Sequence, residues 1–416
     1  MTYFSIFFNI DVVVYGKYDW AMPNIKPEVE AFARIKVVGV GGSGGNTVNH
    51  MIRAKVQGVD FIAINTDAQD LHHNLATKKI HIGKNLTRGL GAGMNPDLGR
   101  QAAEETIEEI KDALKGADMA FIVCGFGGGT GTGGAPVIAE VARSQGALTV
   151  SVVTRPFTFE GAQRARIAEE GLMQLKGSVD AMVLIPNDRL LSVIEKGTTF
   201  KDAFAVCDEV VRQAVQGISD LITMPGIVNV DFADVRAIMQ DAGSALMGIG
   251  KGTGETRAID AAKQAINSPL LDVAIDGARG VLFSIHGGPD MSMWEVQEAA
   301  RVITESIDKD AKVIFGAVED ARLKKGEIKV TVIASGFPSD MMRFNVFSGG
   351  TDNKSTKKPD QVITVNRPVA PAGGASTRLL THSTVAVSPV PVGTEEELES
   401  KESDEWDVPA FFRRKR

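Results

Sequence analysis

The sequence predicts an α/β protein whose largely parallel sheet is covered by helices on both faces. From residue 34 onward, short apolar runs bounded by turn residues alternate with segments of helical periodicity. This alternation is typical of a parallel sheet, because a crossover helix must return the chain between parallel strands. At 416 residues the chain also exceeds what one compact core usually holds, which indicates two domains with accessory segments.

The strands expected in the first domain are the short apolar runs. They fall at residues 35–40, 61–65, 119–124, 148–153 and 181–185. One intervening helix is well marked, since Asn95 suits the N-cap and Pro96 suits the first turn. Its apolar residues recur at helical spacing, at Ala103, Ile107, Ile110 and Leu114.

A long helix is expected at about 200–223, where apolar residues repeat every three or four positions until Pro225 and Gly226 end the pattern. Beyond it we expect a smaller α/β domain with a mixed or parallel sheet. Its predicted elements are helices at 255–267 and 293–307 and strands at 281–285, 313–317 and 328–334.

The composition argues against several classes of protein. Aromatic residues make up only 6% and the net charge is −7, so the chain lacks the stacking platforms and basic surface of a nucleic-acid binder. Cys124 and Cys207 lie in apolar periodic segments without a CxxC partner, which favours buried thiols over a metal site. No apolar run is long enough to span a membrane, and we expect a cytoplasmic protein.

A first glycine loop follows the first predicted strand and precedes a helix. Residues 39–45 contain five glycines. Such a loop lets backbone N–H groups and a helix N-terminus surround phosphates. Taken alone, it also fits a dinucleotide-binding fingerprint or a tight turn.

A second glycine loop, at 127–134, follows the strand that ends at Cys124 and opens another helix. Two such loops at the carboxyl ends of parallel strands indicate a phosphate chain held from two sides. Thr130 and Thr132 add hydroxyl donors. The chain has no GxxxxGK[ST] segment, and neither loop contains a lysine, so Mg²⁺ is expected to offset the phosphate charge.

The second loop resembles the tubulin signature GGGTG[ST]G, and together with five further segments the chain is similar to the FtsZ family of bacterial cell-division GTPases. Those segments are 65–69 (NTDAQ), 91–96 (GAGMNP), 155–157 (RPF), 185–188 (IPND) and 229–234 (NVDFAD). The resemblance covers roughly residues 35–336 and resumes in the last ten residues. It implies a tubulin-like fold in which a Rossmann-type GTPase domain is joined by a long central helix to a smaller α/β domain.

The resemblance also implies a role for each matching position. It assigns Gly42, Ser43, Gly44, Gly45 and Asn46 to the phosphates, with Asn46 reaching toward the nucleoside; Gly129, Thr130 and Gly131 to the α- and β-phosphates; Ala92, Gly93 and Asn95 to the γ-phosphate; Glu160 and Arg164 to the ribose; and Asn187, Phe204 and Asp208 to guanine. The ligands implied are GTP or GDP with Mg²⁺ held mainly by the phosphates.

The chemistry of these side chains agrees with the implied roles. A carboxylate such as Asp208 accepts hydrogen bonds from guanine N1–H and N2–H, which adenine does not offer. Judged without the resemblance, Asp208 would be interpreted as a solvated helix position. Glu160 and Arg164 would be interpreted as an ordinary i,i+4 pair.

Two carboxylates, Asp231 and Asp234, follow Asn229 just beyond the long helix. Asn229, Asp231 and Asp234 are the candidate catalytic residues. The two acids are able to position a water molecule or approach a cation, whereas the local alternative is an N-cap with a first-turn acid. About fifteen residues of helix separate Asp208 from this loop, which is roughly 22 Å. We therefore expect the acids to act on the nucleotide of a neighbouring molecule, in a head-to-tail homopolymer that hydrolyses GTP between subunits.

The remaining segments lie outside the two α/β domains. The predicted organisation is an N-terminal extension at 1–33, a GTP-binding domain at 34–199, a central helix at 200–224, a C-terminal domain at 225–337, a disordered linker at 338–405 and a terminal peptide at 406–416. Residues 1–21 are either a true extension or precede a start at Met22. The terminal peptide resembles the segment by which the family docks onto membrane-anchoring division proteins, which implies a place in the mid-cell division ring.

Three alternatives stay open at this point. A nicotinamide-dependent dehydrogenase would explain the first glycine loop only. A tubulin relative of plasmid segregation would share the second loop but not the terminal peptide. A non-hydrolysing structural relative would lack the acids of the loop at 226–234.

Overall fold

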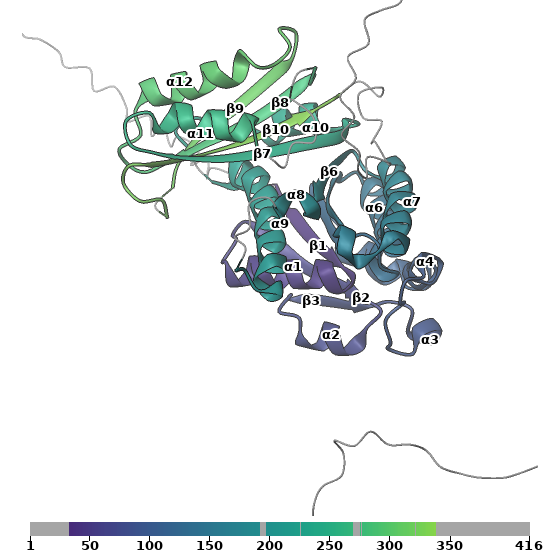
Figure 1. Ribbon diagram of the computed structural model, residues 1–416. Helices are drawn as coiled ribbons and strands as arrows, with labels where there is room; N and C mark the ends of the chain where they lie inside the picture. Colours follow the sequence, from purple (N-terminus) through teal and green to yellow (C-terminus); the bar gives the residue numbers. More distant parts are fainter. Residues whose placement is uncertain are drawn as a thin grey trace, which may run out of the picture. The chain divides into compact units, whose positions relative to one another are not determined.

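The computed structural model describes residues 33–191, 197–224, 226–268, 275, 277–320 and 322–337. Our predictions for the N-terminal extension, the linker, the terminal peptide and Pro225 lie outside these residues. The described strands form a single sheet of ten strands in the order β3-β2-β1-β4-β5-β6-β7-β10-β8-β9. The structure has the α/β architecture expected from the sequence, with helices on both faces of the sheet (Figure 1).

The first six strands are all parallel. They are β1 (Ile35–Val40), β2 (Val59–Asn65), β3 (Lys78–His81), β4 (Met119–Gly125), β5 (Leu148–Arg155) and β6 (Ala181–Pro186). The helical segments between and after them are α1 (Gly41–Arg53), α2 (Ala68–His73), α3 (Lys84–Thr87), α4 (Pro96–Glu105), α5 (Ile107–Leu114), α6 (Thr130–Ser144), the 3-10 turn η1 (Thr158–Glu160), α7 (Ala162–Ser178) and α8 (Asn187–Leu190).

Alternate residues of these strands fill two separate cores. Val37 and Phe121 pack with α1 and α9 (Phe200–Thr223), whereas Val38 and Ile122 pack with α4, α5, α6 and α7. This division follows from the two-residue repeat of a strand, which sends successive side chains to opposite faces. Burial on both faces explains why these strands are continuous apolar runs.

The second half of the sheet is mixed, one of the two arrangements expected. Strand β10 (Glu327–Ser335) is antiparallel to β7 (Gly243–Thr253) and β8 (Gly280–Gly287), and β8 is parallel to β9 (Lys312–Glu319). Helices α11 (Arg257–Ile266) and α12 (Met293–Thr304) cover one face over a third core. Helix α10 (Phe232–Met239) and the end of α9 belong to the core of the other face.

The sequence did not predict β7, because four glycines at 243, 248, 250 and 252 weaken its strand pattern. Two of these glycines have a packing reason. A Cβ on Gly250 would lie 1.9 Å from the carbonyl oxygen of Ala261, and one on Gly252 equally close to that of Arg257. Glycine therefore lets the backbone of α11 rest directly on β7.

Two further elements differ from the prediction. The single helix expected after Asn95 is two helices, because Thr106 leaves the helical conformation at φ −112° and ψ 23°. Strand β3 was also missed, since its two lysines interrupt a four-residue element.

Within the described residues, no helix is long and apolar enough to cross a membrane.

Candidate functional site

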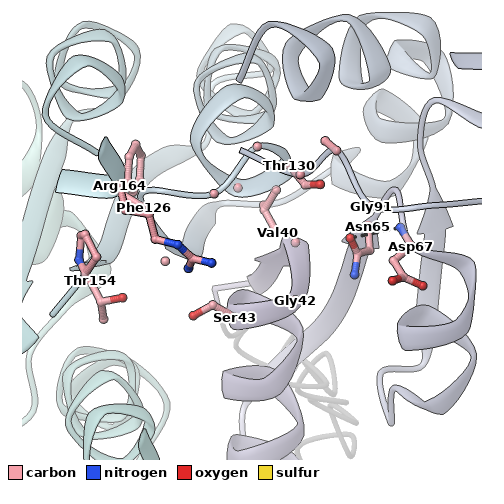
Figure 2. Close-up of a pocket in the computed structure, with 18 of the residues that line it drawn as sticks. Val40, Gly42, Ser43, Asn65, Asp67, Gly91, Phe126, Thr130, Thr154 and Arg164 are labelled. Atoms are coloured by element: carbon pink, nitrogen blue, oxygen red, sulfur yellow. Dashed lines mark hydrogen bonds between the residues drawn. The ribbon is translucent and has the colours of Figure 1, made fainter. Parts of the chain in front are cut away.

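A cavity of about 520 Å³ opens at the carboxyl ends of the parallel strands (Figure 2). This is the edge where ligands bind in open α/β sheets. In Figure 2, Asn65, Asp67 and Gly91 lie on one side of the opening and Thr154 and Arg164 on the other. The wall is formed by Val40, Gly41, Gly42, Ser43, Asn65, Asp67, Asp70, Gly91, Ala92, Gly93, Gly125, Phe126, Gly128, Gly129, Thr130, Gly131, Thr154, Pro156, Glu160, Arg164, Asn187 and Phe204.

Two helix N-termini reach the cavity with their backbone donors uncapped. Helix α1 begins at Gly41 and α6 at Thr130, and neither has a side-chain cap or an acidic residue in its first turn. The first N–H groups of a helix have no partner within the helix, and its N-terminus carries partial positive charge. The site therefore offers two sets of backbone donors to an anion, which is the arrangement that binds phosphate.

The glycines of both loops allow backbone segments to approach one another closely. A Cβ on Gly44 would lie 2.3 Å from the carbonyl oxygen of Val123, and one on Gly129 would lie 2.7 Å from that of Gly93. A Cβ on Gly128, by contrast, would meet nothing within 4 Å. The first loop is thus packed tightly against β4 and the second against the loop at 92–95, while Gly128 leaves open space for a ligand.

One wall carries two carboxylates. Asp67 caps α2 by accepting hydrogen bonds from the backbone N–H groups of Gln69 and Asp70, and Asn65 Nδ2 donates to Asp70 Oδ2 at 2.7 Å. Burial, reinforced by the neighbouring charge of Asp67, raises the pKa of Asp70. Sequence analysis missed Asp70 as a wall residue, although the segment at 65–69 immediately precedes it.

The opposite wall contains the predicted pair Glu160 and Arg164. Arg164 Nη1 donates to Glu160 Oε2 at 2.9 Å, and the backbone N–H of Phe157 donates to Glu160 Oε1 at the same distance. The ring of Phe204 meets that of Phe157 edge to face, with centroids 5.3 Å apart. The i,i+4 pair considered as the local alternative therefore exists, and both its members also line the cavity.

At this end of the cavity a buried polar atom lacks a partner. Asn187 is 5% exposed, and its Oδ1 accepts no hydrogen bond from any described residue. Such an atom is costly unless a ligand or water supplies a donor. Asp208 lies one turn beyond Phe204 on α9 and accepts a hydrogen bond from Thr47 Oγ1 at 2.6 Å; burial raises its pKa.

The structure gathers most of the predicted nucleotide-binding residues in the cavity wall. Thr132, expected as a hydroxyl donor, is instead buried outside the wall, where its Oγ1 accepts a hydrogen bond from the N–H of Gly127. Five of the residues assigned to the nucleotide are not in the wall either. Gly44 and Gly45 are buried in α1, Asn46 is exposed, Asn95 caps α4 by accepting from the N–H of Leu98, and Asp208 lies behind Phe204. The wall residues to which the sequence analysis assigned no role are Val40, Gly41, Asn65, Asp67, Asp70, Gly91, Gly125, Phe126, Gly128, Thr154 and Pro156.

The three candidate catalytic residues lie beyond the other end of α9. Asp231 is the N-cap of α10, where it accepts from the N–H of Ala233, and Asp234 is in the first turn. Asn229 Oδ1 accepts from the N–H of Gly226 at 2.6 Å. All three are exposed and none lines the cavity. Phe204 lies nineteen residues before Thr223, the last residue of α9, which corresponds to a helical rise of about 28 Å.

Few side chains of the cavity could act as oxygen ligands to a hard cation such as Mg²⁺. Thr130 and the carboxylates of Asp67 and Asp70 are oxygen donors of the kind that Mg²⁺ prefers. In the part of the chain that the structure describes, however, no three His, Cys, Asp or Glu side chains converge to hold a metal. The residues therefore fit a Mg²⁺ ion that takes most of its ligands from phosphate and water.

The fold and the cavity define a GTPase of the tubulin class. Residues 34–195 match the Tubulin/FtsZ family GTPase domain, and residues 243–338 match the FtsZ family C-terminal domain. The chain belongs to the FtsZ family. It is 48% identical to the FtsZ of M. jannaschii in an empty dimer, covering 73% of this chain and 88% of that one with a TM-score of 0.70.

Two further solved structures are similar. A tryptophan-to-tyrosine mutant of the same M. jannaschii FtsZ is also 48% identical, covers 74% of this chain and 92% of that one, and has a TM-score of 0.71. CetZ2 from Haloferax volcanii, in a GTPγS-bound protofilament, is 24% identical with a TM-score of 0.63 and covers 74% and 94% of the two chains. At that identity the likeness to CetZ2 concerns the fold alone.

Proposed function

We propose that this protein binds GTP in the cavity, assembles head to tail into filaments and hydrolyses GTP where two subunits meet. One observation carries the proposal: the cavity adjoins the beginning of α9, whereas Asp231 and Asp234 follow its end. In this account residues 34–199 form the GTP-binding domain and residues 225–337 form the C-terminal domain, which supplies the acids. Residues 200–224 are the central helix that connects the two domains. Membership of the FtsZ family supports a role for the filaments in the cytokinetic ring of a dividing bacterium.

The bound nucleotide has a defined direction in this proposal. Its phosphates meet the N-termini of α1 and α6, and its γ-phosphate contacts the loop at 92–95. The guanine meets Phe204, Asn187 and Asp208, where the unpartnered Oδ1 of Asn187 can accept a base N–H. Mg²⁺, when bound, neutralises phosphate charge.

Two observations support self-assembly: a relative that forms a dimer, and exposed apolar side chains beside both proposed sites. The M. jannaschii relative was solved as a dimer. Leu90 and Met94, beside the cavity, are 71% and 44% exposed, and Ile227, beside the acids, is 67% exposed. Large apolar side chains left in water next to both sites are suited to a contact in which one end of a subunit covers the other end of the next.

Hydrolysis then depends on the loop at 226–234. Asp231 and Asp234 are placed to hold or polarise the attacking water, and Asn229 keeps the loop in shape through the N–H of Gly226. A subunit at the end of a filament would hold GTP without an acid opposite it. Loss of the γ-phosphate would remove support from the contact beside residues 92–95.

Assembly is the most direct test of this function. Light scattering of the purified protein is expected to rise with GTP and Mg²⁺ and to fall back as GTP is consumed. GDP should give no rise, because the γ-phosphate is missing, and ATP should give none, because adenine lacks the N1–H and N2–H donors. Equal scattering with ATP and GTP would contradict the assignment of Asn187 and Asp208 to the base.

The terminal peptide gives a second prediction. We propose that residues 407–416 bind a membrane-anchoring division protein, with Val408, Phe411 and Phe412 as apolar anchors and the basic residues 413–416 adding charge attraction. Deleting 407–416 is expected to leave GTP-dependent scattering and phosphate release unchanged and to abolish recruitment to the division site in cells. Loss of GTPase activity in the deletion would contradict this division of roles.

A further inference from the structure

Three basic residues form a row across the second half of the sheet. Lys329 of β10 pairs directly with Lys251 of β7 on one side and with His286 of β8 on the other. Directly paired residues project from the same face of a sheet. Ile333 and Met247 lie four residues from Lys329 and Lys251 along the same strands, and therefore on that face, and both belong to the core that includes α9. The basic row therefore faces α9.

A cleft of about 200 Å³ lies between the basic row and the second half of α9. Arg212 and Asp220 of α9 and Arg322 line it opposite the row. This cleft shares no lining residue with the nucleotide cavity. It is large enough for a small ion and its hydration water but too small for a nucleotide.

The carboxylates in the cleft already have cationic or amide partners. Arg212 Nε donates to Glu209 at 2.7 Å, and although burial opposes it, this and neighbouring hydrogen bonds hold the pKa of Glu209 at about 2. Asp220 accepts from Gln216 at 2.9 Å and from Arg322 at 3.1 Å. Arg322 Nε also donates to Asp320 at 2.7 Å.

The two lysines have no such partners. Neither Lys329 Nζ nor Lys251 Nζ makes a hydrogen bond or ion pair with any residue the structure describes. Burial, followed by the charges of Arg212 and Lys251, lowers the pKa of Lys329 to about 8, against the raising effect of Asp220 and Glu209. Like charges placed directly across a strand pair destabilise a sheet. The two lysines are thus paired directly across two strands beside a cleft whose carboxylates make their hydrogen bonds to Arg212, Gln216 and Arg322.

His286, the third residue of the row, adds a neutral donor, although its Nδ1 lies 3.9 Å from Asp320 Oδ2. Burial lowers the pKa of His286 to about 4, against the raising effect of Asp220, so its ring is neutral near pH 7 and carries one N–H. On the next pair along the same face, next to the cleft but not in its lining, the buried hydroxyls of Ser284 and Thr331 lack hydrogen-bond partners among the described residues.

We propose that this cleft binds a small oxyanion of the phosphate class, held by the ammonium groups of Lys329 and Lys251 beneath α9. A tetrahedral oxyanion accepts hydrogen bonds from several donors at once, and it would relieve the repulsion between the two lysines. Because α9 also carries Phe204 and Asp208, such an ion would bind along the same helix that meets the nucleotide.

The test uses the full-length protein saturated with GDP and measures its melting temperature against inorganic phosphate, with chloride adjusted to constant ionic strength. The wild type is expected to show a saturable rise in melting temperature. Lys329→Met and, separately, Lys251→Met are expected to weaken the apparent phosphate affinity by at least about tenfold, the effect of one lost charge-assisted hydrogen bond. Lys251 is exposed, so its variant should fold even if the other does not.

The control is Lys263→Met, which removes an exposed lysine from α11 on the other face of the sheet and should keep the wild-type response. Lys329→Arg, which restores the charge, should recover phosphate binding. GDP affinity should be unchanged in all four variants, which separates this cleft from the nucleotide cavity. A wild type that responds to phosphate no more than to chloride, or a Lys251→Met variant with an undiminished response, would overturn the proposal.

Discussion

Replacing Asp234 by alanine is expected to lower GTP turnover by about 10² to 10⁴-fold, the usual contribution of a general acid or base, while GTP affinity stays unchanged. Asp234 is exposed in the first turn of α10, and no hydrogen bond or ion pair of its side chain occurs among the described residues. The substitution should therefore cost at most the modest helix-terminus effect of about 0.3–1 kcal/mol. Phosphate release at saturating GTP, together with nucleotide binding, measures the two quantities separately.

A mixing experiment tests whether the acid acts across a subunit contact. The partner variant is Ser43→Glu, because a carboxylate at the N-terminus of α1 would repel the phosphates and occupy their donors. Each variant alone is expected to be nearly inactive, whereas their mixture should recover turnover wherever an intact cavity meets an intact Asp234. Glu255→Ala, which removes an exposed acid elsewhere, serves as the matched control. Full turnover by Asp234→Ala alone would eliminate the catalytic role.

The separation of the two sites was predictable because it depends on one strongly periodic element. The helix expected at about 200–223 is observed as α9 at Phe200–Thr223. Its length follows from the rise per residue alone, so the distance between its ends requires no knowledge of tertiary packing. The strands β1, β4 and β5 were predictable for a similar reason, since each is a buried apolar run that ends at turn residues.

The missed strand β7 has a residue pattern that is determined by its tertiary contacts and not by strand propensity. Glycines in β7 accommodate the backbone of α11, so the strand lacks the β-branched pattern that would identify it. The cavity wall shows the same limit. Phe126 and Thr154 enter it only because β4 and β5 end side by side, and Asp70 enters through its hydrogen bond with Asn65. A local sequence pattern cannot show that residues from separate elements meet in one cavity wall.

Replacing Gly133 by alanine is expected to destabilise the protein by about 3 kcal/mol or more, the upper range for overpacking a core. A Cβ on Gly133 would lie 1.8 Å from the carbonyl oxygen of Pro96 and 2.7 Å from the backbone nitrogen of Arg100. Backbone atoms cannot turn aside as a side chain can, so α4 must move away from α6. Urea unfolding measures the loss, and GTP affinity should fall as well, because α4 begins directly after the loop at 92–95.

The neighbouring Gly134 provides the matched control within the same helix. Its added Cβ would meet no atom closer than 3.6 Å, an ordinary contact distance. Alanine there should be neutral or stabilise the protein by about 0.4–1 kcal/mol, since it restricts the unfolded chain without a clash. The two variants share composition and helix propensity and differ only in what the methyl group meets. Equal stability of the two would contradict the close backbone contact between α6 and α4 at Gly133.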